Sequence, residues 1–145
     1  LVDDLLAAAG LDNYEVSNWA RPGHESRHNF LYWRGADYRG FGCAAHSHHA
    51  GRRWWNVRTP DRFIELVNAG RSAESSSELL DDEARRIEGL QLLLRTREGV
   101  PIDAFDEAQL ELLDDMLAPH PDSAGRVVLT RAGRLMANEV SVRLR

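Results

Sequence analysis

The most informative stretch of the chain is residues 27–33, which read Arg27-His28-Asn29-Phe30-Leu31-Tyr32-Trp33. It brings an imidazole, an amide, a phenol and an indole together within six residues. Tyrosine and tryptophan offer flat apolar rings with a polar handle, and histidine offers a nitrogen that titrates or binds a metal. This combination suits a flat, partly polar, metal-bearing ligand such as a porphyrin. The alternative is a buried aromatic turn whose histidine and asparagine satisfy backbone groups.

Two further motifs flank this run. Residues 14–23 read Tyr-Glu-Val-Ser-Asn-Trp-Ala-Arg-Pro-Gly, and residues 38–47 read Tyr-Arg-Gly-Phe-Gly-Cys-Ala-Ala-His-Ser. With the His-Asn-x-x-Tyr-Trp signature between them, the motifs resemble the C-terminal part of the HemN/HemW family of radical-SAM proteins. The signature itself resembles the HemW branch, whose members are haem chaperones often labelled oxygen-independent coproporphyrinogen III oxidase-like. The resemblance covers nearly the whole chain.

The resemblance implies a mixed α/β fold in two parts. Residues 1–71 would be the last strands and helices of a radical-SAM partial (β/α) barrel, 72–78 a linker, and 79–145 a mostly helical, winged-helix-like HemN-type C-terminal domain. The family's Cys-x3-Cys-x2-Cys motif lies near its N-terminus, whereas this chain has the single cysteine Cys43. We therefore expect the [4Fe–4S] cluster and S-adenosylmethionine to belong to a preceding radical-SAM domain of a longer parent protein.

The function implied for the parent is haem binding and haem delivery to haemoprotein acceptors. The alternative is an oxygen-independent coproporphyrinogen III oxidase, which decarboxylates two propionates oxidatively in porphyrin synthesis. Ser17 stands near the position where the oxidase branch has an acid that contacts a cofactor, so this branch is disfavoured. Without cluster thiolates, the chain alone is expected to lack radical chemistry.

Two groups of site residues follow from the resemblance. The haem-binding group has an imidazole that can ligate iron and rings that can face the macrocycle, and comprises His28, Asn29, Tyr32 and Trp33. The S-adenosylmethionine cleft group lies at predicted strand ends or in a strand of small residues, and comprises Glu15, Ser17, Gly42 and Ala45. For Glu15, the equal alternative to a cofactor contact is a structural role as a paired carboxylate. For Gly42, the alternative is that the glycine only lets two strands cross closely.

Composition narrows the class of protein. The 145 residues are 43% hydrophobic, and the formal net charge of −5 argues against nucleic acid as a partner. One cysteine excludes an internal disulfide and a cysteine-held cluster within this chain. No apolar run approaches the roughly 20 residues of a membrane span, and no signal peptide is present, so we expect a cytoplasmic protein. Because Leu1 falls inside a helical pattern, we also expect the chain to be the closing third of a larger protein.

Periodicity predicts the individual elements. In the first half we expect a helix ending near Gly10, strands over 14–18 and 38–46, a strand over 53–57 after an Ala50-Gly51 turn, and a helix from Thr59 to Gly70. Helix followed by strand is typical of a parallel sheet or barrel. The serine-rich residues 72–78 are typical of an exposed connector.

The second half is predicted to be mostly helical. Helices over 81–97 and 103–117, a short strand over 125–129 and a final helix from Thr130 form a winged-helix-like order. A self-standing winged-helix interaction module at 79–145 is therefore a third possibility. DNA binding is disfavoured because residues 103–115 carry six acids.

Residues 43–49 hold one cysteine and three histidines, as a metal site would. A strand sends alternate side chains to opposite faces, so Cys43 and His49 would lie on one side and His46 and His48 on the other. We therefore expect no metal site here, and iron only as part of haem at His28.

Overall fold

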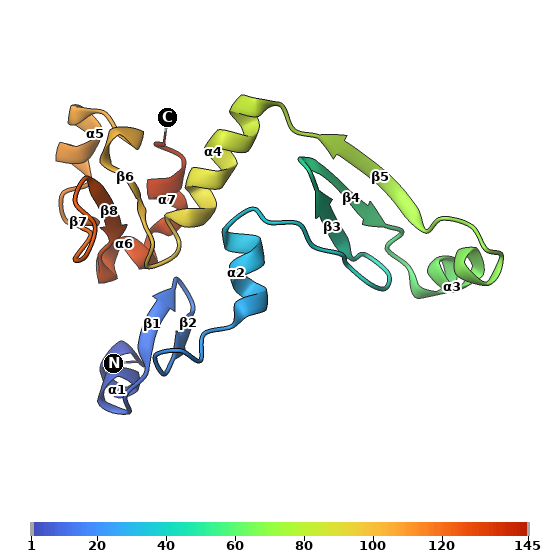
Figure 1. Cartoon of the computed structure of the whole chain (residues 1–145), viewed down its shortest axis with the longest axis horizontal. Helices are drawn as coiled ribbons and strands as arrows, with labels where there is room; N and C mark the ends of the chain where they lie inside the picture. Colours follow the sequence, from blue (N-terminus) through green and yellow to red (C-terminus); the bar gives the residue numbers. More distant parts are fainter. Residues whose placement is uncertain (1, 145) are drawn as a thin grey trace. The chain divides into compact units, whose positions relative to one another are not determined.

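The computed structural model describes residues 2–144 (Figure 1). Within that range the chain forms two compact units. The first unit contains the residues up to Arg34 together with those from Ile87 onward, and the second unit contains Gly35–Arg86.

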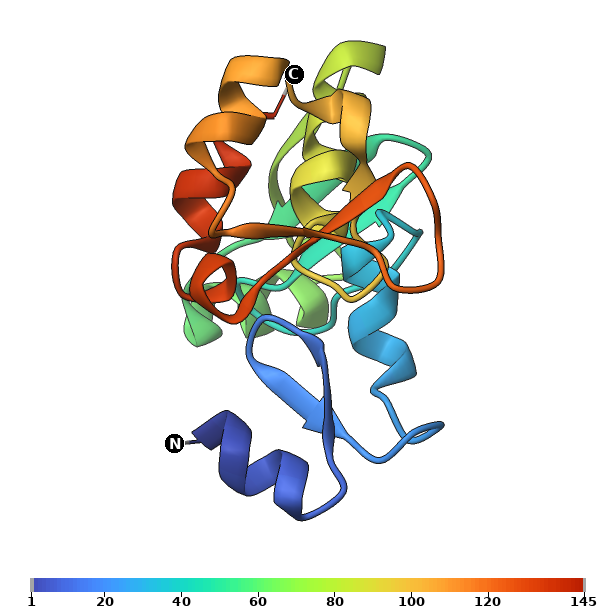
Figure 2. The same cartoon turned by 90° about the vertical axis from the view of Figure 1, so that its left-hand side faces the viewer.

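The first unit opens with a helix, a β-hairpin and a second helix. These elements are α1 (Val2–Ala8), β1 (Asp12–Glu15), β2 (Asn18–Ala20) and α2 (Arg27–Trp33). β1 and β2 pair antiparallel, and Figure 2 shows this blue hairpin leading away from α1. Ser26 caps α2, since its hydroxyl accepts a hydrogen bond from the Asn29 amide at 3.2 Å.

The remainder of the first unit follows α4, a helix that begins among the last residues of the second unit. The elements are α4 (Asp82–Leu93), β6 (Val100–Pro101), a 3₁₀ turn (Ile102–Ala104), α5 (Glu107–Leu112), β7 (Leu117–Pro119), β8 (Arg126–Leu129), α6 (Arg131–Leu135) and α7 (Ala137–Ser141). The three strands form an antiparallel sheet in the order β6-β8-β7. Short helices around a small antiparallel sheet give the winged-helix-like character expected of this region.

The described hydrophobic core lies in this unit. Its buried side chains lie just after α4, in the three strands, and in or next to the helical segments that follow: Leu94, Val100, Ala104, Phe105, Leu113, Leu117, Val127, Leu129, Ala137, Val140 and Leu144. Leu94, Val100 and Val140 are fully buried. Burial of each such aliphatic side chain contributes roughly 1.5–3 kcal/mol.

The second unit is a three-stranded antiparallel sheet with one helix. Its elements are β3 (His46–His49), β4 (Arg52–Asn56), α3 (Pro60–Asn68) and β5 (Glu74–Leu79), and the strand order is β3-β4-β5. Ala50 and Gly51 join β3 to β4, and both have positive φ, 49° and 81°. Two positive φ angles in a two-residue loop suit the right-handed twist of a hairpin.

The mixed α/β class, the Ala50-Gly51 hairpin and the start of α3 at Pro60 are confirmed. The parallel arrangement expected from the order of helix and strand is not found, because every strand pair among residues 2–144 is antiparallel. The strand predicted over 38–46 is wrong. Tyr38 makes only an isolated bridge to His48, and the chain between Gly40 and Ala44 turns, with positive φ at Gly42 and Ala44.

The predicted connector at 72–78 is also not an unstructured linker. Glu74–Leu79 forms β5, whose backbone pairs with β4 although all six of its residues are exposed. The serine- and glutamate-rich sequence of this segment does not alternate apolar with polar side chains. It forms a strand because its backbone pairs with the neighbouring strand β4. In addition, the two compact units divide at Arg34 and Arg86 rather than at this segment.

Two of the predicted C-terminal helices are shorter than expected. The helix over 103–117 contracts to Glu107–Leu112, because Asp106 and Gln109 form a capping box that starts it later. Leu113 and Leu117 keep their helical spacing and are both buried, yet Leu117 belongs to β7. The final helix is divided at Met136 into α6 and α7. Among residues 2–144, none of the helices is both long and apolar enough to span a bilayer.

Candidate functional site

His28 and Tyr32 lie one helical turn apart on α2 and contact each other. The His28 Nε2 and Tyr32 Oη atoms are 2.8 Å apart, and the two rings meet edge to face with centroids separated by 5.0 Å. Both side chains are exposed, Tyr32 to 38%. If the neutral ring carries its proton on Nδ1, the phenol donates to Nε2, and iron reaches this nitrogen only after the phenol turns away.

Asn29 and Trp33 form a second pair on α2, also one turn apart, and both are half-buried. The Trp33 Nε1 atom is buried and has no hydrogen-bond acceptor among residues 2–144. Across the same described range no hydrogen bond joins the Asn29 side chain to His28, so the partner of the imidazole is Tyr32. The four haem-binding candidates thus share one helix on two adjacent faces.

The rest of α2 is anchored to the first unit. Phe30 packs against the buried Tyr14, with ring centroids 5.6 Å apart, and the Tyr14 hydroxyl accepts a hydrogen bond from the Ser26 amide at 3.4 Å. The Arg34 guanidinium lies 4.7 Å from the centre of the Phe30 ring and pairs with Glu98. Hydrogen bonding to Glu98 raises the pKa of Arg34. One face of α2 is therefore held while the face with His28 and Tyr32 stays exposed.

Glu15 is the most unusual polar side chain of the predicted cleft group. It is 2% exposed at the end of β1, and its Oε1 atom has no hydrogen-bond partner among the described residues. Backbone hydrogen bonds fix the strand on either side, from the Val16 amide to the Arg95 carbonyl at 2.8 Å and from the Arg97 amide to the Tyr14 carbonyl at 3.0 Å. A buried acceptor without a donor costs about 1–3 kcal/mol, so this carboxylate is poised for a donor group.

The other three cleft candidates occupy turns and loops. Ser17 is exposed in the turn between β1 and β2. Gly42 and Ala45 lie in the loop before β3, where the Gly42 carbonyl accepts a hydrogen bond from Asn56 Nδ2 at 2.8 Å and the Ala45 carbonyl accepts one from the Asn56 amide at 3.0 Å. A Cβ atom added at Gly42 would meet nothing within 4 Å. Glu15 and Ser17 belong to the first unit, Gly42 and Ala45 to the second.

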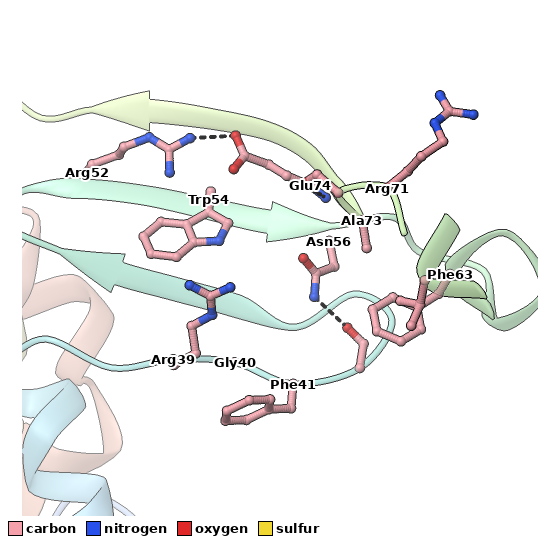
Figure 3. A pocket seen from close by; sticks show the side chains of 13 residues that line it. Arg39, Gly40, Phe41, Arg52, Trp54, Asn56, Phe63, Arg71, Ala73 and Glu74 are labelled. Atoms are coloured by element: carbon pink, nitrogen blue, oxygen red, sulfur yellow. Dashed lines mark hydrogen bonds and ion pairs between the residues drawn. The ribbon is translucent and has the colours of Figure 1, made fainter. Parts of the chain in front are cut away.

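The second unit contains a pocket that the sequence did not indicate. It has a volume of about 480 Å³ and is lined by residues of the loop before β3, of β4, of α3 and of the segment leading into β5 (Figure 3). Its prominent side chains are arginines and aromatic rings: Arg39, Arg52, Arg71, Phe41, Trp54 and Phe63. The alternation of Arg52, Trp54 and Asn56 was the available signal, since residues two apart share a face of a strand.

Within residues 2–144 no group of three or more histidine, cysteine, aspartate or glutamate side chains is arranged to hold an ion. In the segment where such a site was considered, His49 Nδ1 instead lies 2.9 Å from Asp37 Oδ2.

Comparison with known proteins places these features in a family. The chain is 41% identical to the heme chaperone HemW of Mycobacterium tuberculosis over 97% of its length, and 32% identical to the heme chaperone HemW of Bacillus subtilis over 97%. It covers 36% and 40% of those two proteins, so it spans little more than a third of the length of the curated relatives it matches. No family model matches the chain.

A solved structure has the same fold. Coproporphyrinogen III oxidase (HemN) from Escherichia coli, a radical SAM enzyme, superimposes with a TM-score of 0.69 over 97% of this chain and 38% of that one. At 16% sequence identity this likeness is one of fold. The matches to HemW proteins over 83–97% of its residues show that the chain belongs to the HemW family.

Proposed function

We propose that this chain binds haem through α2 and that, as part of a HemW-like protein, it serves haem delivery to haemoprotein acceptors. The main support is the 41% identity to a protein named heme chaperone HemW over 97% of the chain. The likeness to HemN concerns the fold and carries no oxidase activity to this chain.

The geometry of α2 is compatible with haem as a transferable cargo. The His28 imidazole is exposed, and a neutral imidazole nitrogen is a common ligand of haem iron. The Tyr32 phenol beside it offers a competing hydrogen bond to the same nitrogen. Release of haem would restore that hydrogen bond, so the phenol lowers the free energy needed to dissociate haem from His28. The Trp33 indole N–H has no acceptor within the described range, so it needs one from a ligand or solvent.

The test is titration of the chain with ferric haem, followed by the Soret absorbance. His28→Ala should weaken binding at least tenfold and remove the spectrum of an imidazole-ligated iron. His24→Ala is the matched control, because His24 is an exposed histidine of the same unit outside α2, and it should behave as wild type. Unchanged affinity and spectrum in His28→Ala would rule out ligation by this residue.

Tyr32→Phe separates ligation from the competing hydrogen bond. If the phenol restrains Nε2, its removal should leave the Soret spectrum in place and slow haem release to an acceptor such as apomyoglobin. Faster release in Tyr32→Phe would mean that the phenol helps hold haem rather than free it.

We further propose that Glu15, Ser17, Gly42 and Ala45 contribute to a cleft for S-adenosylmethionine in the whole protein. Glu15 fits this role because its buried Oε1 atom lacks a donor in the part of the chain that the structure describes, and Gly42 fits because no described atom occupies the space beside its α-carbon. When bound next to a reduced [4Fe–4S] cluster, S-adenosylmethionine supplies radical chemistry. Within this chain the residues can only orient it, since a single cysteine cannot supply the thiolates of a cluster.

The proposed cytoplasmic location rests on the sequence and stays a prediction.

A further inference from the structure

The pocket of the second unit has the composition of a ligand site. Its volume of about 480 Å³ falls within the roughly 300–1,000 Å³ of small-molecule sites, and every lining residue belongs to Gly35–Arg86. The geometry points to a site for a flat ring system that carries a carboxylate group.

The strand β4 supplies the floor of this site. Arg52, Trp54 and Asn56 alternate along the strand and face the pocket together. The guanidinium carbons of Arg39 and Arg52 lie 5.4 and 4.9 Å from the centre of the Trp54 indole, and Figure 3 shows the two groups flanking this ring. The Trp54 indole thus keeps the guanidinium groups of Arg39 and Arg52 close to each other.

Positive charge predominates in the pocket, although the chain as a whole is acidic. Three arginines line it against one glutamate, Glu74, which pairs with Arg52 at 2.5 Å. Arg39 has no carboxylate within ion-pair distance among residues 2–144. A guanidinium held by an aromatic face and not paired with an acid is available for an anion, and its planar fork matches a carboxylate.

An exposed aromatic ring on a fixed backbone lies at the rim of the pocket. Phe41 is 87% exposed, and Gly40 separates it from Arg39. The Gly40 amide donates to Ser47 Oγ at 3.0 Å, and a Cβ atom on Gly40 would overlap the His46 carbonyl oxygen. Ser47 is 2% exposed, so the segment is anchored in the sheet and presents Arg39 and Phe41 in place.

Together these groups favour a ligand with a flat apolar body and an anionic edge. The rings of Phe41 and Phe63 offer surface to the body, and Arg39 offers the fork to a carboxylate. A porphyrin with its propionates is one member of this class, and its choice as a probe rests on the proposed function. The site itself uses neither iron nor His28.

The experiment is a titration of the full chain with metal-free protoporphyrin IX, followed by porphyrin fluorescence, in parallel with its dimethyl ester. The free acid should bind at least tenfold more tightly than the ester. Arg39→Gln should remove most of that difference, and Phe41→Ala should weaken both ligands. Arg58→Gln changes an exposed arginine of the same unit outside the pocket and should match wild type.

Because the probe carries no iron, His28 cannot ligate it, so the dependence of its affinity on Arg39 separates failure of this site from failure of haem ligation at α2. Equal binding of acid and ester, or wild-type affinity in Arg39→Gln, would overturn the proposal. Gly42, which the proposed function assigns to the S-adenosylmethionine cleft, also lines this pocket. Tighter binding of S-adenosylmethionine than of the porphyrin would therefore overturn the proposal, since the pocket would then belong to that cleft. If Arg39→Gln does not fold, Arg39→Lys keeps the charge but removes the planar fork, and it should likewise reduce the difference between acid and ester.

Discussion

Replacing Glu15 by methionine should make the chain more stable. The Glu15 side chain is 2% exposed and its Oε1 atom has no donor among residues 2–144, so the folded state bears the desolvation cost of an acceptor without a hydrogen bond. That deficit is about 1–3 kcal/mol for a polar group and larger for a charged one. Methionine has similar length, needs no donor and adapts its shape to the site.

We therefore expect Glu15→Met to raise the free energy of unfolding by about 1–3 kcal/mol, which corresponds to a rise in Tm of at least about 4 °C for a unit of roughly a hundred residues. Chemical denaturation followed by circular dichroism measures the change. Glu15→Gln is the matched control, because it removes any buried charge but keeps an oxygen without a donor, and its stability should lie between those of wild type and Glu15→Met. A loss of more than about 1 kcal/mol in Glu15→Met would mean that the carboxylate has a buried partner, and the reasoning would be refuted.

Three further predictions concern turns and ion pairs. Gly99→Ala should destabilise the chain by several kcal/mol in urea unfolding, because φ at this position is +60° and the new Cβ would overlap the Val127 carbonyl oxygen; wild-type stability would refute it. Ala50→Gly should stabilise the chain by about 1 kcal/mol, because φ of 49° strains a residue with a Cβ; an unchanged thermal midpoint would contradict this. The hydrogen bond from Arg131 lowers the pKa of Asp4 from 3.8 to about 2, so its stabilising effect is complete above pH 3.8 and is lost as the pH falls towards 2. Arg131→Gln should reduce this acid sensitivity in pH-dependent melts, and an identical pH profile in both proteins would oppose the assignment.

Local chemistry predicted the elements whose causes lie within a few residues. The Ala50-Gly51 turn and the Thr59-Pro60 helix start depend on backbone preferences of single positions, and both are present. By contrast, the helix α2 over Arg27–Trp33 was not predicted, so the contact between His28 and Tyr32 one turn apart was found only in the structure.

The sequence could not predict features that depend on distant partners. β5 is a strand because β4 offers it hydrogen bonds, while its own residues lack an apolar pattern. The pocket draws Arg39, Trp54 and Phe63 from three separate segments, so no local motif contains it. The lack of a described hydrogen-bond donor at Glu15 Oε1 likewise cannot be predicted from sequence, because it depends on which donor groups the fold brings close to this atom.

The interrupted layout of the first unit has a consequence for biosynthesis. Glu15 bridges to Thr96, and the Val16 and Tyr14 backbones bond to Arg95 and Arg97. At the roughly 5–20 residues per second of translation, the ribosome needs on the order of 4–16 seconds between synthesising the hairpin and synthesising the residues around Thr96. The hairpin must therefore wait with its apolar face uncovered while Gly35–Arg86 is made and has time to fold. A nascent chain of this kind is a natural client for trigger-type chaperones that shield early segments during elongation.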